Sequence, residues 1–314
     1  MGRQPRPRTE LGAFLAVRRA AVAPQEVGLP PVGQPRRVPG LRREEVAQLA
    51  GVSVDYYVRL EQGRTAGASD SVLTAIARAL RLGPDETTYL LELGRRGPDA
   101  RGGGGAGGAD DASVRDASGG SGGPGGYGGS DGSHPDGPID PQTRLLLDTI
   151  GDASAMVLGR RMDVLAWNAV ATALFLDFAT VPVEHRNLVR LLFLDPRVRG
   201  LYADWACVAS TSVALLRMAA GPRVRDPRLA ALVAELSAAD SDFRRWWARH
   251  DVRAMSRGSK RFEHPVAGPL TVRWQGLKVM SAPEQTLIVH TAAPDPTSEA
   301  ALRLLAGQVA VRPR

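Results

Sequence analysis

Residues 41 to 63 constrain this chain most, because their pattern predicts two short helices joined by a three-residue turn. Gly51 stands where the chain must reverse, since only glycine adopts a positive φ without a steric penalty. Ser53 follows it and can cap the second helix, which we expect to begin at the next residue. Tyr57 and Leu60 are three residues apart in that helix and can both pack inward. This arrangement is typical of a DNA-binding helix-turn-helix.

The spacing resembles the phage-repressor (XRE, Cro-type) class of helix-turn-helix, including a small residue in the first helix, the turn glycine and a closing Leu-Glu-Gln-Gly. The resemblance places Val54, Asp55 and Arg59 at base edges, where Val can contact a thymine methyl, Asp can accept from cytosine and Arg can read guanine. The resemblance places Tyr56 and Arg64 nearer to phosphate. The complete set that we expect to bind DNA is Arg43, Ser53, Val54, Asp55, Tyr56, Arg59 and Arg64.

Three further helices surround the motif. Thr9 to Val22 supplies one before it, and Asp70 to Leu82 and Asp85 to Leu93 supply two after it. Together these predict an all-α, five-helix DNA-binding domain over residues 1–97. The alternative is an αα-hairpin that packs a core without binding DNA.

The charge of the chain favours a polyanionic partner without showing where it binds. The formal net charge is +7, and only two of the 40 basic residues, Lys260 and Lys278, are lysines. Such an arginine bias is typical of a high-GC genome. Residues 1–97 and the segment from residue 139 onward are both net basic, so the motif, and not the charge, identifies the DNA-binding part.

One cysteine, Cys207, excludes an internal disulfide and any multi-cysteine zinc site. Its neighbours are small and apolar, so we expect it to lie in a core. The first ten residues lack the apolar segment of a signal peptide, and no apolar run reaches the roughly 18 to 20 residues of a membrane span. We therefore expect a cytoplasmic protein with no membrane contact.

Residues 98–138 consist mainly of Gly, Ser, Asp and Pro, with few apolar residues. Such a composition cannot bury a core, so we expect a disordered linker. A second domain then follows over residues 139–310.

This second domain is predicted to be α+β. Apolar runs at 155–158 and 164–167 predict two strands, and three more strands are expected within 260–265, 269–280 and 286–292. Between them the pattern is helical, with one long helix expected over 196–220, and the domain closes with a helix at 298–305. Two strands, a helical insert and three strands predict an antiparallel sheet with helices packed on it.

A wider resemblance covers nearly everything except the linker. Its segments are GLRREEVAQLAGVSVDYYVRLEQGR, VLGRRMDVLAWN, RNLVRLLFLDPRVRGLYADW, DPRLAALVAELS, WARHDV and VHTA. Together they resemble the MmyB-type transcription regulators of actinobacteria. The resemblance implies a PAS-like C-terminal domain that binds a small apolar or fatty-acyl ligand.

Six residues of the second domain are candidates to line such a ligand site. Trp167 and Asn168 stand at a strand's end, Tyr202 and Trp205 are three residues apart on the expected helix, and His250 and Arg253 lie near a helix end, where Arg253 could pair with a carboxylate. For each of the six, a structural role in the core or at a cap is the alternative.

No motif of catalysis is apparent, and the histidines show no metal spacing. We therefore expect a regulator that is not an enzyme and needs no cofactor or metal. Helix-turn-helix regulators usually act as dimers on half-sites about 34 Å apart, so we expect a homodimer or association on DNA. The competing functions are a ligand-binding or protein-interaction module with a vestigial helix-turn-helix, and an enzyme with an appended DNA-binding domain.

Overall fold

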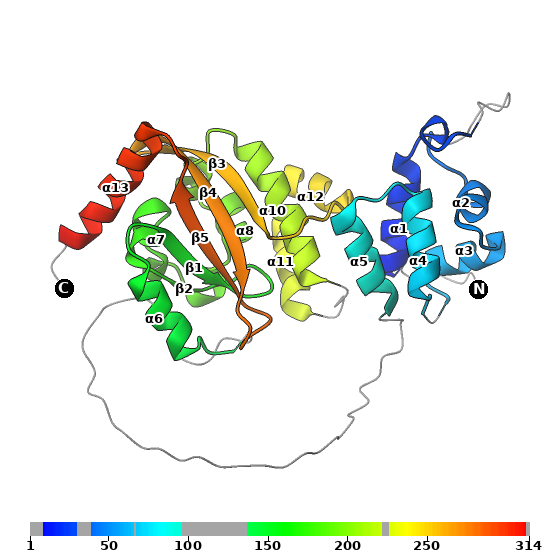
Figure 1. Cartoon of the computed structure of the whole chain (residues 1–314), viewed down its shortest axis with the longest axis horizontal. Helices are drawn as coiled ribbons and strands as arrows, with labels where there is room; N and C mark the ends of the chain where they lie inside the picture. Colours follow the sequence, from blue (N-terminus) through cyan, green and yellow to red (C-terminus); the bar gives the residue numbers. More distant parts are fainter. Residues whose placement is uncertain (1–8, 30–38, 66, 96–136, 222–225, 312–314) are drawn as a thin grey trace, which may run out of the picture.

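The computed structural model describes residues 9–29, 39–65, 67–95, 137–221 and 226–311. These residues form an N-terminal helical bundle and a C-terminal domain built on a sheet (Figure 1). The predicted linker, residues 98–138, lies outside the described residues except for its last two. The fold class is α+β, as predicted.

The N-terminal bundle contains five α-helices and one 3-10 turn among its described residues: α1 (Glu10–Ala21), η1 (Pro24–Val27), α2 (Arg43–Ala50), α3 (Val54–Glu61), α4 (Asp70–Ala79) and α5 (Pro84–Arg95). Their apolar faces meet in one core around Phe14, Tyr57 and Tyr89, all at most 1% exposed. The five predicted helices are confirmed, with bounds that shift by up to three residues.

Close approach of α1 and α3 depends on a glycine. A Cβ atom built on Gly12 would lie 2.2 Å from the carbonyl oxygen of Glu61. Thr9 caps the same end of α1, because its Oγ1 accepts from the Gly12 N–H at 3.2 Å. The start of α1 is therefore held against the end of α3.

The C-terminal domain is built on five antiparallel strands, in the spatial order β2-β1-β5-β4-β3. Their bounds are β1 (Ser154–Leu158), β2 (Val164–Trp167), β3 (Arg257–His264), β4 (Gly268–Lys278) and β5 (Thr286–Ala292). Antiparallel register places Trp274 of β4 opposite His290 of β5, and Lys260 of β3 opposite Val272 of β4. Two strands, a helical insert and three strands thus form the predicted sheet.

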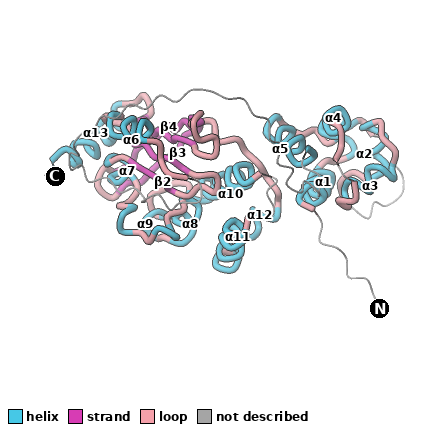
Figure 2. The backbone as a smooth tube through the Cα atoms, turned by 90° about the horizontal axis from the view of Figure 1, so that it is seen from below, coloured by secondary structure: helices cyan, strands magenta, loops and turns pink. Residues whose placement is uncertain are grey.

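Helices cover both faces of this sheet: α6 (Pro141–Thr149), α7 (Ala169–Leu174), α8 (Leu188–Leu194), α9 (Pro196–Arg199), α10 (Trp205–Ala220), α11 (Pro227–Ala239), α12 (Ser241–Ala248) and α13 (Pro296–Val311), with short 3-10 turns at Phe178–Thr180 and Val183–His185. Most of them lie over one face, where Met156 and Val272 join the main core. On the other face, Leu147 of α6 packs with Ala155 and Val157. Figure 2 shows α8, α10 and α11 side by side beneath the strands.

The long helix predicted over 196–220 is wrong, because residues 200–204 are not helical. Residues of this segment pair with the edge strand β3: the Glu263 N–H donates to Leu201 O at 2.7 Å and the Ala203 N–H to Arg261 O at 3.1 Å. These bonds satisfy an exposed strand edge, which outweighs local helix propensity. Tyr202 and Trp205 are therefore not on one helix.

Cys207 is exposed on α10, so the predicted core position is also wrong. The helix faces the core with Ala209, Val213 and Leu216, whose spacing leaves Cys207 on the outer side. Among the described residues, no helix is both long and apolar enough to cross a membrane.

Candidate nucleic-acid interface and ligand-binding domain

The outer edge of α3 is the candidate DNA-binding surface. Gly51 ends α2 with φ of 66°, and the Ser53 Oγ caps α3 by accepting from the Tyr56 N–H at 3.2 Å. Val54 is 42% exposed, and the side chains of Asp55 and Arg59 are exposed and form an i,i+4 ion pair at 3.4 Å. The predicted turn and cap are confirmed, and the three residues expected at base edges share one accessible side of α3.

A buried carboxylate holds α3 in place from the inner side. Glu61 is 1% exposed and accepts from Arg19 Nε at 2.9 Å and from Arg43 Nη2 at 2.7 Å. Burial alone would raise the pKa of Glu61, but the hydrogen bonds and positive charges of the two arginines outweigh it and lower the pKa. One side chain thus joins α1, α2 and α3.

The remaining residues expected on DNA have mixed environments. The Arg43 guanidinium is partly exposed and contacts Glu61, so it supports the fold from the edge of the surface. Tyr56 is partly buried against the bundle core, whereas Arg64 is exposed. DNA contact by any of these residues remains a prediction.

Two of the candidate ligand residues line one aromatic region of the C-terminal interior. The Trp167 ring packs on Phe178, and the Tyr202 ring packs on Phe262, with centroids 5.2 Å and 4.9 Å apart. Phe175 joins them, since it contacts both Phe178 and Phe262. This region lies over the inner face of the sheet.

Asn168 and Trp205 have defined structural partners. The Asn168 Oδ1 accepts from the Ala155 and Ala171 N–H groups at 3.0 Å, and its Nδ2 donates to Ala153 O at 2.8 Å. The Trp205 Nε1 donates to Leu192 O at 3.0 Å, and its ring belongs to a separate aromatic group with Phe193 and Trp246. Asn168 fixes β1, β2 and α7 together.

His250 and Arg253 lie where the two domains meet. His250 follows α12 with φ of 51°, and its Nδ1 lies 3.0 Å from the Glu10 carboxylate of α1. The Arg253 side chain is exposed, and its backbone N–H donates to Ala214 O. The structure therefore separates these two residues from the aromatic region; a ligand-binding role for any of the six remains a prediction.

Several polar contacts form the junction between the domains. Glu10 pairs with Arg217 of α10 and accepts from the Tyr89 hydroxyl at 3.2 Å. Arg18 of α1 donates to His250 O at 2.7 Å, and Asp85 of α5 accepts from the Ala254 N–H at 3.0 Å. The junction thus connects α1 and α5 directly to the C-terminal domain, without the linker.

Arg217 is the most deeply buried charge at the junction, with a side chain only 4% exposed. Its guanidinium lies 3.9 Å from the Trp247 ring centroid and donates to Trp247 O at 2.6 Å. A cavity of about 190 Å³ adjoins Arg217. Residues of both domains line this cavity, and one of them is Asp226 at the start of α11.

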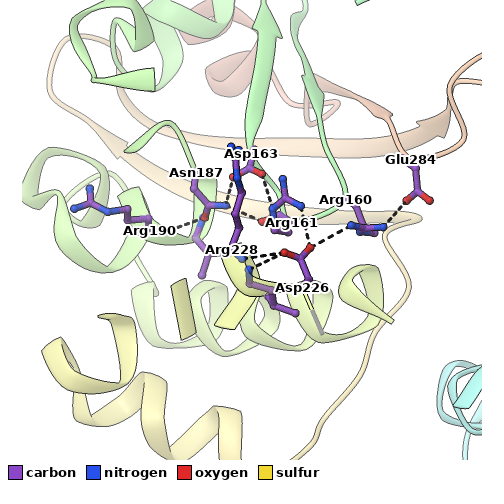
Figure 3. A network of polar contacts seen from close by, with 10 residues as sticks. Arg160, Arg161, Asp163, Asn187, Arg190, Asp226, Arg228 and Glu284 are labelled. Carbon is purple, nitrogen blue, oxygen red and sulfur yellow. Dashed lines mark hydrogen bonds and ion pairs between the residues drawn. The ribbon is translucent and has the colours of Figure 1, made fainter. Parts of the chain in front are cut away.

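Asp226 also connects this junction to the sheet. It accepts from Arg161 at 2.9 Å and Arg160 at 3.2 Å, both in the β1–β2 turn, and it caps α11 through the Arg228 N–H (Figure 3). Asn187 of the same network donates to Arg161 O at 2.7 Å. A contiguous polar network therefore runs from the sheet to the cavity at the junction.

The sequence patterns did not reveal the pairings of Glu10 and Glu61, or that Lys260 of β3 lies beside the rings of Tyr202 and Trp274. Glu10 and Glu61 stand at helix ends, where a carboxylate is usually solvated, and their partners are distant in the chain. Lys260 carried one detectable signal, because it alternates with Phe262 and His264 on the inner side of β3.

Comparison with known protein families matches both domains. Residues 10–90 match a helix-turn-helix domain. Residues 139–305 match the MmyB-like transcription regulator ligand binding domain. No curated protein matches the chain at a significant level. Both matched domains are regulatory, and together they make this a DNA-binding transcription regulator with a ligand-binding domain. The chain belongs to the MmyB-like transcription regulators.

Proposed function

We propose that α3 enters the major groove of a specific operator, with Val54, Asp55 and Arg59 at base edges. The observation that carries this proposal is the exposure of these three side chains on one side of a helix that Glu61 holds from within. A rigidly supported, solvent-facing helix end is what base readout requires. Tyr56 and Arg64 flank this edge and would contact phosphate, and Ser53 and Arg43 complete the proposed DNA-binding surface.

We further propose that a small apolar or fatty-acyl ligand in the C-terminal domain changes operator affinity. Support comes from the direct junction of α1 and α5 with the segment that follows α12. A ligand that binds one arrangement of this junction more tightly than another would increase the fraction of molecules in that arrangement. If the two arrangements differ in operator affinity, the ligand would change how tightly the protein binds DNA. Residues 1–97 and 139–310 would act as the two coupled domains of a cytoplasmic homodimer.

The DNA-binding proposal is tested by a mobility-shift titration of the full chain on the DNA upstream of its own operon. We expect specific binding whose affinity falls as salt rises, because phosphate contacts release counterions. A random duplex of equal length is the control. Equal affinity for both duplexes would contradict specific regulation and favour a vestigial motif.

The ligand proposal is tested by native mass spectrometry of the purified protein, followed by the same titration after delipidation. A co-purifying molecule whose removal changes operator affinity is the expected result. If removal or saturation leaves the affinity unchanged, the domains are not coupled.

A further inference from the structure

The side chain of Lys260 places an ammonium group on the inner side of the edge strand β3 in the C-terminal domain. Lys260 is half-buried and follows the alternation that buries Phe262 and His264, while Ser259 and Arg261 are exposed. It is one of only two lysines in a chain that otherwise uses arginine for positive charge.

Aromatic rings surround this group. The Lys260 Nζ lies 5.9 Å from the Tyr202 ring centroid and 5.7 Å from that of Trp274. The Trp274 side chain packs directly against Gly258 of β3, because a Cβ atom on Gly258 would lie 2.6 Å from Trp274 Nε1. His290, which pairs with Trp274 across β4 and β5, is 1% exposed. Burial is the main cause that lowers the pKa of His290, and the nearby Lys260 charge lowers it in addition.

No acid neutralises Lys260 within the parts of the chain that the structure describes. No ion pair or hydrogen bond joins its Nζ to another described residue, and no buried polar side chain of the C-terminal domain is acidic. Aromatic rings attract a cation but do not cancel its charge. Burial lowers the pKa of Lys260 to about 8, which is the response of an ammonium that lacks a counter-ion.

We propose that Lys260 binds the anionic head group of the domain's ligand, held between the Tyr202 and Trp274 rings. A carboxylate here would supply the missing counter-charge, and the row of Phe262, Phe175 and Phe178 would contact an apolar body. This inference rests on the proposed ligand-binding role of the domain. It narrows the ligand to an amphiphile with one negative end.

The two lysines make a direct test practical. In full-length protein with ¹³Cε-labelled lysine, Lys260 and the exposed Lys278 give two signals, and Lys278 is an internal reference. We expect the pKa of Lys260 in the free protein to lie well below the ordinary lysine value, because burial lowers it. Saturation with dodecanoate should raise the pKa of Lys260 by more than one unit, whereas dodecanol, which lacks the charge, should not raise it.

Calorimetric titration of variants gives the second arm. Lys260→Met should weaken dodecanoate binding at least tenfold and leave dodecanol binding unchanged, and Lys260→Arg should restore part of the affinity. Lys278→Met is the matched control and should change neither. The melting temperature of Lys260→Met without ligand should be no lower than that of the parent, because an uncompensated charge has been removed.

The proposal is wrong if dodecanoate leaves the titration of Lys260 unchanged, or if Lys260→Met binds dodecanoate as tightly as the parent. Operator binding is measured separately on the same preparations. Its loss would contradict the proposed DNA-binding function and leave the lysine result standing.

Discussion

Glu10 at the start of α1 and Arg217 in α10 form an ion pair between the two domains. Both are largely shielded from water, and the Glu10 carboxylate also contacts His250 and the Tyr89 hydroxyl. This one side chain of the DNA-binding domain thus has three partners: Arg217 and His250 belong to the C-terminal domain, and Tyr89 belongs to its own domain. The ion pair thus joins the C-terminal domain to α1, the helix whose Arg19 contacts Glu61 of α3.

Glu10→Gln should loosen this junction. The substitution leaves the buried Arg217 charge without its counter-ion, which typically costs about 2–5 kcal/mol of interface free energy. We expect the radius of gyration in small-angle scattering to increase. Asp251→Asn removes the half-exposed partner of Arg18 and is the control, with an expected cost of at most about 1 kcal/mol. An unchanged radius for Glu10→Gln would show that the ion pair does not hold the domains together.

Glu61→Gln should destabilise the DNA-binding domain by about 3–5 kcal/mol, because Arg19 and Arg43 would remain charged without a buried partner. Urea unfolding measures this change. Glu299→Gln, in the exposed pair with Arg303 on α13, should cost less than about 1 kcal/mol. Similar costs for both variants would argue against Glu61 as the central support of α3.

Gly12→Ala should separate α1 from α3, since the new methyl group would overlap the Glu61 carbonyl. Overpacking of this kind costs about 1–3 kcal/mol. Gly307→Ala in α13 meets no atom within 4 Å and should instead stabilise by roughly 0.5–1 kcal/mol through helix propensity. Thermal unfolding of the two variants should therefore shift in opposite directions; a shift in the same direction contradicts the close contact.

Arg59→Ala should weaken binding to the cognate operator by about 1–3 kcal/mol while leaving random DNA nearly unaffected, if the guanidinium reads a base. Fluorescence anisotropy with both duplexes separates the two contributions. Arg303→Ala in α13 controls for the loss of one positive charge. An equal loss on both duplexes would identify Arg59 as a phosphate contact.

Stability should fall in acid through Glu10 and Glu61. Their folded pKa values lie below the ordinary carboxyl value of 4.5, so both stabilise the protein above that pH. The contribution disappears as pH falls from 4.5 through the lower folded pKa values. Melting temperatures recorded by circular dichroism between pH 7 and 3 should show this decline, and Glu61→Gln should reduce its steepness. A decline of the same steepness in Glu61→Gln would remove Glu61 as a cause.

Most of the helix-turn-helix could be predicted because its signals are local. The turn at Gly51, the cap at Ser53 and the inward pair Tyr57 and Leu60 depend on residues within a few positions of one another. The strand-helix-strand order of the second domain was predictable for the same reason. Tyr202 was misplaced because hydrogen bonds to a strand sixty residues later override its local helical pattern.

The sequence by itself determined most of the helices, the five strands, the turn at Gly51 with the cap at Ser53, and which side chains of α3 point outward. These follow from the periodicity of backbone and side chains, which acts over one or two turns. Only the tertiary structure decided that Glu61 pairs with Arg19 and Arg43, that His250 contacts Glu10, and that Lys260 lies near the rings of Tyr202 and Trp274. Such contacts depend on which faces meet when distant segments pack, and no local pattern encodes that choice.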